Sequence, residues 1–156
     1  MERRPPLTVL IADDDPDDRL LVSDALAETP TFGDVREVAD GEELMDYLLV
    51  RGRFTHAGDA PRPDVILLDL NMPKMGGREV LAEIRHDPVL RRIPIVVMST
   101  SGAEEDVDLS YELGANSFVR KPASFGALTE AMKTLGSYWA TVVTLPGSPT
   151  SRGGAN

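Results

Sequence analysis

Short apolar runs alternate with segments of helical periodicity along this chain, and this alternation constrains the fold more than any other feature. The runs lie at residues 7–13, 35–39, 65–68, 95–98 and 118–120. The third run, Val-Ile-Leu-Leu, contains no polar residue, which is typical of a central strand that is buried on both faces. A repeated β–α pattern within 156 residues predicts one domain, with a parallel sheet between two layers of helices.

Right-handed crossovers leave few topologies open for such a sheet. Of the two common doubly wound strand orders, 2-1-3-4-5 places the first and third strands side by side at the switch point. We therefore predict a five-stranded α/β domain of the flavodoxin-like type at residues 1–146, followed by a disordered polar tail at 147–156.

Two of the helical segments have clear ends or faces. Asp15 and Pro16 predict the N-cap and first residue of a helix that continues to about Glu28. Its expected core residues form two i,i+4 pairs, Leu21 with Ala25 and Val22 with Leu26.

The last helix begins near Ser124 and ends before Pro146. Its apolar stripe comprises Leu128, Ala131, Met132, Leu135, Trp139 and Val142. Beyond Leu135, the stripe either covers the sheet or extends outward to pair with a second copy of the chain.

Polar side chains stand where four of the predicted strands end, namely Asp13 and Asp14, Asp69, Ser99 and Lys121. Ligands bind outside the carboxyl ends of the strands in open parallel sheets, so we expect these groups to converge. Three nearby carboxylates repel one another unless they share a proton or bind a cation. Mg²⁺ takes oxygen ligands and commonly uses one or two carboxylates. We therefore expect Asp14 and Asp69 to bind Mg²⁺ directly and Asp13 to bind it through water.

A carboxylate in such a site can also be a nucleophile that becomes an aspartyl-phosphate, and Asp69 is the candidate. Lys121 and the Ser99 hydroxyl would then stabilise the phosphoryl oxygens. Taken alone, Ser99 could equally satisfy backbone groups at a strand end, and Lys121 could be solvated. Asp15 is a helix cap rather than a ligand. An EF-hand calcium loop does not fit, because Asp18 stands where that loop requires glycine.

Composition excludes several other classes. The formal net charge of −10 argues against nonspecific binding to nucleic acid. The absence of cysteine excludes disulfides and thiolate metal sites. No apolar run approaches the roughly 20 residues of a membrane helix, and the N-terminus lacks the apolar stretch of a signal peptide. We therefore expect a soluble, cytoplasmic protein that does not bind membranes. A nucleotide-binding module is also disfavoured, since no glycine-rich phosphate loop follows the first strand.

In combination, these motifs resemble the receiver domain of two-component response regulators. The resemblance runs over residues 7–145. It rests on Ile11-Ala12-Asp13-Asp14-Asp15-Pro16, Leu67-Leu68-Asp69-Leu70-Asn71-Met72-Pro73, Val97-Met98-Ser99-Thr100 and Gly114-Ala115-Asn116-Ser117-Phe118-Val119-Arg120-Lys121-Pro122.

The resemblance implies a role for each residue of the site. Asp69 would be the phosphoacceptor, and Asp13 and Asp14 the metal-binding acids. The backbone carbonyl of Asn71 would complete the Mg²⁺ site. Ser99 and Phe118 match the hydroxyl and the aromatic ring that change rotamer on phosphorylation. Lys121 matches the phosphate-binding lysine, and the bond from it to Pro122 is often cis in this family. Gly76 departs from the aspartate that the family commonly has after the acceptor strand, which concerns the loop rather than phosphorylation.

The long loop at residues 51–63 and the stretches at 104–116 and 138–146 are similar to a narrower group, the single-domain regulators paired with bacterial phytochromes. This resemblance implies a stand-alone switch that is phosphorylated by a sensor histidine kinase, a bacteriophytochrome, and that acts through partners. It implies a signalling protein that catalyses its own phosphorylation and dephosphorylation rather than an enzyme. It also implies a homodimer through the helix 4–strand 5–helix 5 face or the C-terminal helix. The alternative is a Mg²⁺-dependent phosphohydrolase with an aspartyl-phosphate intermediate, but such enzymes need an aspartate where this chain has Asn71.

Overall fold

Five parallel strands form one sheet in the order β2-β1-β3-β4-β5 in the computed structural model, which describes residues 6–56, 58–100 and 103–139. The strands are β1 (Leu7–Ala12), β2 (Phe32–Val38), β3 (Val65–Leu68), β4 (Ile95–Ser99) and β5 (Ser117–Arg120). The predicted fold class and strand order are confirmed. The edge strand β2 begins at Phe32 rather than at Val35, because Phe32 pairs with Leu7 before the register shifts.

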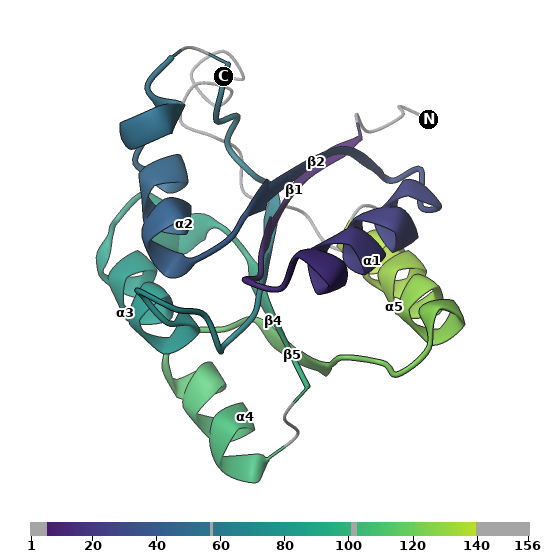
Figure 1. Cartoon of the computed structure of the whole chain (residues 1–156). Helices are drawn as coiled ribbons and strands as arrows, with labels where there is room; N and C mark the ends of the chain where they lie inside the picture. The colour runs from purple at the N-terminus through teal and green to yellow at the C-terminus, as the bar shows by residue number, and fades with distance from the viewer. Residues whose placement is uncertain (1–5, 57, 101–102, 140–156) are drawn as a thin grey trace, which may run out of the picture.

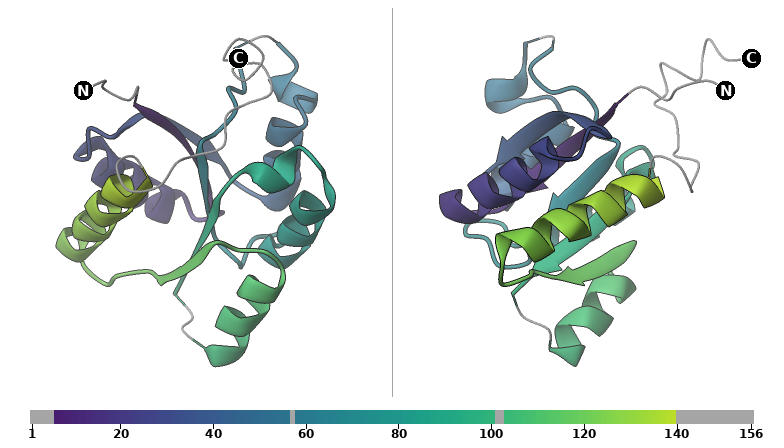
Figure 2. Two further views of the ribbon diagram at one scale, coloured as in Figure 1. Left: turned by 180° about the vertical axis from the view of Figure 1, so that it is seen from behind. Right: turned by 90° about the vertical axis from the view of Figure 1, so that its right-hand side faces the viewer.

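Helices cover both faces of the sheet (Figures 1 and 2). They are α1 (Pro16–Ala27), α2 (Gly41–Leu48), α3 (Gly77–His86), α4 (Glu104–Glu112) and α5 (Phe125–Ser137), with short 3₁₀ helices η1 (Gly52–Phe54) and η2 (Leu90–Arg92). Figure 2 shows α1 and α5 on one side of the sheet and α2, α3 and α4 on the other. The sheet therefore separates two hydrophobic clusters. Successive residues of β1 alternate between them, Val9 and Ile11 toward α1 and α5, Leu10 and Ala12 toward α2 and α3.

The apolar faces of the helices agree with the sequence pattern except in α1. The first helix buries Val22, Ala25 and Leu26, whereas Leu21 is 45% exposed, so its predicted core position is wrong. The buried stripe of α1 is narrow, and Leu21 lies at its border, where it lines a groove. The α5 stripe remains part of the core as far as Trp139, which is 7% exposed. Val142, Pro146 and the predicted tail at 147–156 lie outside the described residues.

Two local predictions concern the chain next to the strand ends. Asp15 is the N-cap of α1, and its carboxylate accepts hydrogen bonds from the backbone N–H groups of Asp17 and Asp18. The bond between Lys121 and Pro122 is trans, like every other peptide bond in the described residues, so the cis form implied by the resemblance is not seen. Within these residues, no helix combines the length and apolar character needed to cross a membrane.

Candidate functional site

The strand ends at one edge of the sheet hold the predicted polar residues side by side. Because β1 and β3 are paired up to Ala12 and Leu68, the residues that follow, Asp13 and Asp69, are neighbours. The N–H of Asp69 donates to the carbonyl of Ala12 at 2.9 Å. Across the next pair of strands, the N–H of Lys121 donates to the carbonyl of Ser99 at 2.8 Å. The backbone hydrogen bonds between the strands therefore set the distances between the residues of the site.

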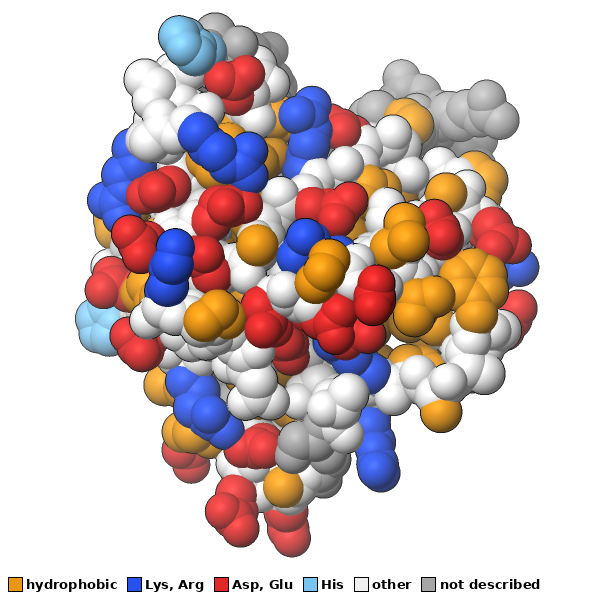
Figure 3. Space-filling view, in the orientation of Figure 1, with side chains coloured by type: hydrophobic (Ala, Val, Ile, Leu, Met, Phe, Trp, Pro, Cys, Tyr) orange, Lys and Arg blue, Asp and Glu red, His pale blue; other side chains and the backbone are white. Residues whose placement is uncertain are grey.

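The carboxylates of Asp13, Asp14 and Asp69 form an acidic cluster, with one oxygen of each within 4.8 Å of the others. Asp13 and Asp69 are buried, and Asp14 is exposed. Figure 3 shows acidic side chains gathered near the centre of this face, with basic side chains among them. Three carboxylate oxygens with access to solvent on one side are a ligand set that suits a hard divalent cation. The residues present therefore fit a divalent metal.

Burial is the main reason that the pKa of Asp69 is raised to about 6. The positive charge of Lys121 acts against this rise, and the carboxylates of Asp13 and Asp14 add to it. A hydrogen bond from the backbone N–H of Asn71 to the Asp69 carboxylate lowers the pKa in turn. The site therefore resists holding three negative charges without a counter-ion, which is the electrostatic condition that cation binding relieves.

The ammonium group of Lys121 bridges two carboxylates. Its Nζ lies 2.6 Å from Oδ2 of Asp13 and 3.2 Å from Oδ2 of Asp18. Burial alone would lower the pKa of Lys121, but the hydrogen bond to Asp13 and the charges of Asp69 and Asp13 outweigh burial, and the pKa is raised. Lys121 therefore stays positively charged. Among the ion pairs of the described residues, Lys121 is joined to Asp13 and Asp18 rather than to Asp69.

The remaining predicted residues surround this centre. Ser99 is fully buried at the end of β4. Phe118, in β5, is partly buried and packs against the cluster under α2 and α3. Its N–H donates to the hydroxyl of Tyr111, in α4, at 3.2 Å. Asn71 is exposed after the buried Leu70. The movement of Ser99 and Phe118 and the ligand role of the Asn71 carbonyl stay predictions.

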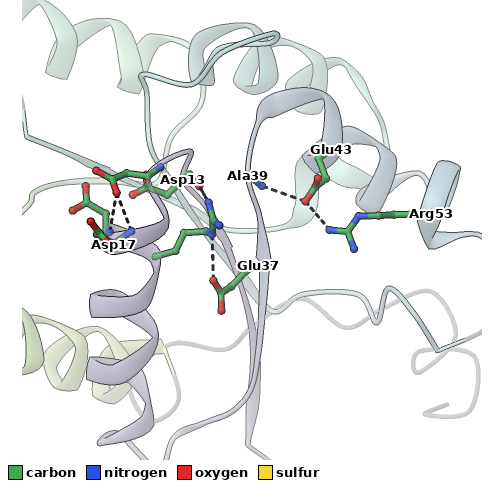
Figure 4. Close-up of polar contacts among 9 residues, drawn as sticks. Asp13, Asp17, Glu37, Ala39, Glu43 and Arg53 are labelled. Atoms are coloured by element: carbon green, nitrogen blue, oxygen red, sulfur yellow. Dashed lines mark hydrogen bonds and ion pairs between the residues drawn. The ribbon is translucent and has the colours of Figure 1, made fainter.

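Two residues of α1 contact the site although no sequence motif predicted a role for them there. Asp18 is the second partner of Lys121. Arg19 donates from Nη1 to the carbonyl oxygen of Asp13 at 2.7 Å and from Nε to Glu37 at 3.3 Å. In Figure 4, Asp13 and Glu37 lie on either side of the guanidinium group that joins them. The sequence spacing could have predicted these contacts, because a helix that starts directly after a strand places its first turn near the end of that strand.

Comparison with known proteins gives a consistent picture. The family model described as "Response regulator receiver domain" matches residues 9–133. Response regulator Rcp1 of Synechocystis sp. is 40% identical over 145 residues, which are 93% of this chain and 97% of Rcp1.

Two solved structures are similar over nearly their whole length. The phosphorylated cyanobacterial phytochrome response regulator RcpA is 42% identical, with a TM-score of 0.83, over 92% of this chain and 100% of that one. The Mn²⁺-bound form of Rcp1 is 39% identical, with a TM-score of 0.81, over 91% of this chain and 100% of that one.

Proposed function

The chain belongs to the response regulator receiver domain family, and on that premise we propose that Asp69 is the residue that accepts the phosphoryl group. The resemblance seen in the sequence motifs is thus confirmed at the level of the family, whose members receive phosphate from histidine kinases in two-component signalling. The observation that carries the choice of Asp69 is its position. It is a buried carboxylate at the end of the central strand β3, and its neighbours are two further carboxylates and the ammonium of Lys121.

The proposed reaction transfers a phosphoryl group from a phosphohistidine of the kinase. A carboxylate oxygen of Asp69 forms the new P–O bond while the P–N bond breaks, and the imidazole nitrogen keeps the electron pair of the broken bond. Lys121 offers positive charge to a second phosphoryl oxygen, and the Ser99 hydroxyl can donate to a third. We propose that the same residues support hydrolysis of the aspartyl-phosphate, so that the domain catalyses both changes of its own state.

We propose Mg²⁺ as the metal, held by Asp13, Asp14, Asp69 and the backbone carbonyl of Asn71. When bound, Mg²⁺ supplies positive charge beside the acidic cluster and the phosphoryl oxygens. The support is the carboxylate cluster itself and the relative Rcp1, whose solved structure is a Mn²⁺-bound form.

The output would be a shift between two packings of the α4–β5–α5 face. Ser99 would move toward the phosphoryl group, and Phe118 would turn into the space that opens. Phosphorylation biases such an equilibrium only through contacts that differ between the two states. The partly buried position of Phe118 supports this role, because the ring has both core contacts and access to the surface.

We propose a bacterial phytochrome with histidine kinase activity as the phosphate donor, because RcpA is described as a phytochrome response regulator. Because such a kinase draws phosphate from ATP, we propose that the protein is cytoplasmic. We further propose a homodimer, through the α4–β5–α5 face or the C-terminal helix.

The family match favours this function over the phosphohydrolase alternative. The second aspartate that such a phosphohydrolase requires is replaced by Asn71 in this chain.

The proposal is tested by phosphotransfer from a phytochrome kinase, and separately from phosphoramidate, with Mg²⁺ present. Wild type should become labelled with acid-stable, base-labile phosphate, and Asp69→Asn should not. Asp24→Asn is the matched control, since Asp24 is an exposed acid in α1. Undiminished labelling of Asp69→Asn would overturn the assignment. Transfer from phosphoramidate but not from phytochrome kinases would overturn only the choice of donor.

A further inference from the structure

The ammonium of Lys121 has two carboxylate partners that differ in how firmly they are held. Asp13 has a side chain that is only 4% exposed, and its second oxygen accepts the N–H of Asp15 at 3.0 Å. The side chain of Asp18 is 36% exposed and lies on the first turn of α1. Water can therefore replace Lys121 as the partner of Asp18 far more easily than as the partner of Asp13.

The ammonium of Lys121 is placed by Asp13 and Asp18, and no ion pair of the described residues joins it to Asp69. The Lys121 side chain is 12% exposed, and it lies with Asp18 in the wall of an open groove of about 550 Å³ between α1 and the start of α5. The ammonium has three N–H donors, and Asp13 and Asp18 take two of them. A phosphoryl oxygen on Asp69 can use the third only by drawing Nζ from its present position against the attraction of both carboxylates. Because Asp13 is buried and accepts a hydrogen bond from the Asp15 N–H, Asp18 is the partner that gives way more easily.

We propose that Asp18 is a positioning residue that holds Lys121 in the unphosphorylated protein and thereby limits the rate at which Asp69 is phosphorylated. This inference rests on the proposed function, because it concerns the lysine that serves the phosphoryl group. Asp18 itself does not touch the reacting atoms; it acts through Lys121. The effect is regulatory, because a stronger ion pair between Asp18 and Lys121 lowers the rate at which the unphosphorylated protein is phosphorylated.

The chain offers a matched control in the preceding residue. Asp17 and Asp18 both lie in the first turn of α1, and the N–H of each donates to the carboxylate of Asp15. Both carry one negative charge at the same helix end. Their side chains differ in that Asp18 pairs with Lys121, whereas no described ion pair joins Asp17 to Lys121. Replacement by asparagine removes the same charge at both positions and leaves the backbone caps in place.

The test measures the second-order rate constant of phosphorylation by phosphoramidate with Mg²⁺, followed by intrinsic fluorescence or by separation of the phosphorylated form. We expect Asp18→Asn to react about two- to fivefold faster than wild type, the range that a partly exposed ion pair gives. Asp17→Asn should stay within about 1.5-fold of wild type, because a distant exposed charge is screened by solvent and salt. Asp18→Glu, which keeps a carboxylate near Lys121, should return the rate toward that of wild type.

A second readout does not depend on phosphorylation. The ¹³Cε and ¹Hε NMR signals of Lys121 in the unphosphorylated protein should shift in Asp18→Asn and stay in place in Asp17→Asn. Equal rates for the two asparagine variants, or a slower Asp18→Asn, would overturn the inference, since charge or helix structure alone would then explain the data. Failure of the proposed function looks different: wild type and all variants would be equally unlabelled. Unchanged Lys121 signals in Asp18→Asn would then still overturn the positioning role.

Discussion

Gly77 is packed so closely against Asp69 that a Cβ built on the glycine would lie 2.7 Å from the Asp69 carbonyl oxygen. The same Cβ would lie 2.7 Å from the Cα of Leu70, and the N–H of Gly77 donates to the Leu70 carbonyl at 3.0 Å. All of these contacts are with backbone, which cannot rotate away. Gly77→Ala should therefore destabilise the fold by about 1–3 kcal/mol and displace Asp69, with slower phosphorylation. Urea unfolding and phosphoramidate labelling measure the two effects.

Gly76→Ala is the control for this prediction, because the nearest atoms to a Cβ at Gly76 are 3.8 Å away or more. Gly76 is also the N-cap of α3 and makes no side-chain cap, so Gly76→Asp should add a few tenths of a kcal/mol of stability. The family's common aspartate is therefore compatible with this loop. Equal loss of stability in Gly76→Ala and Gly77→Ala would show that the close approach to Asp69 is not what constrains Gly77.

Sequence reasoning succeeded where a single segment decides the outcome. The uninterrupted apolar run at Val65–Leu68 predicted the central strand, and Asp15 beside Pro16 predicted the cap of α1. It also placed Asp13 beside Asp69, because the strand order of a parallel sheet determines which strand ends meet. It missed contacts that depend on how a helix lies over those strand ends. The pairing of Lys121 with Asp18 spans 103 residues, and it depends on where the first turn of α1 lies relative to Lys121, which follows β5. No periodicity or cap within either segment carries that information.

The raised pKa of Asp69 predicts a pH-dependent difference in stability between wild type and Asp69→Asn in metal-free buffer. A carboxyl group whose pKa rises from 3.8 to about 6 on folding binds its proton more tightly in the folded state. Its contribution to stability is therefore full below about pH 4 and is lost as the pH rises through 6. At pH 7.5, Asp69→Asn should be more stable than wild type by on the order of 2 kcal/mol, and the advantage should shrink toward pH 4. Urea unfolding in EDTA at both pH values checks this, and an advantage that is independent of pH would contradict it.

Metal binding at the acidic cluster predicts that Mg²⁺ stabilises the wild-type protein at pH 7.5. A ligand that binds only the folded state adds about 2.7 kcal/mol when its concentration is 100 times the dissociation constant. Asp14→Asn should lose most of this gain, because one of the three clustered carboxylates is removed. Asp24→Asn should keep it. Thermal unfolding against Mg²⁺ concentration is the measurement, and a full Mg²⁺ response in Asp14→Asn would place the metal elsewhere.

The hydrogen bond from the Phe118 N–H to the Tyr111 hydroxyl ties β5 to α4 on the proposed output face. Tyr111→Phe removes the acceptor and keeps the ring, so we expect a loss of about 0.5–1.5 kcal/mol and faster hydrogen exchange at the Phe118 amide. Tyr138→Phe serves as the control, since Tyr138 is an exposed tyrosine beyond the end of α5. Unchanged exchange at Phe118 in Tyr111→Phe would mean that the bond does not hold β5 in solution.

Arg19 fixes the backbone at Asp13, and its loss should weaken the metal site without removing a ligand. The guanidinium group joins the Asp13 carbonyl to Glu37 of β2, and the Arg19 side chain is 20% exposed, so it is held more firmly than a fully solvated arginine. Arg19→Gln should lower both the Mg²⁺ affinity and the rate of phosphorylation several-fold, because the backbone that carries the Asp13 carboxylate is then held less firmly. Arg36→Gln is a matched control, since Arg36 also pairs with an acid of β2 but is 38% exposed and has no contact with Asp13 among the described hydrogen bonds. If both variants bind Mg²⁺ like wild type, the buried position of Asp13 is sufficient to aim its carboxylate, and Arg19 contributes only to the packing of α1 on β2.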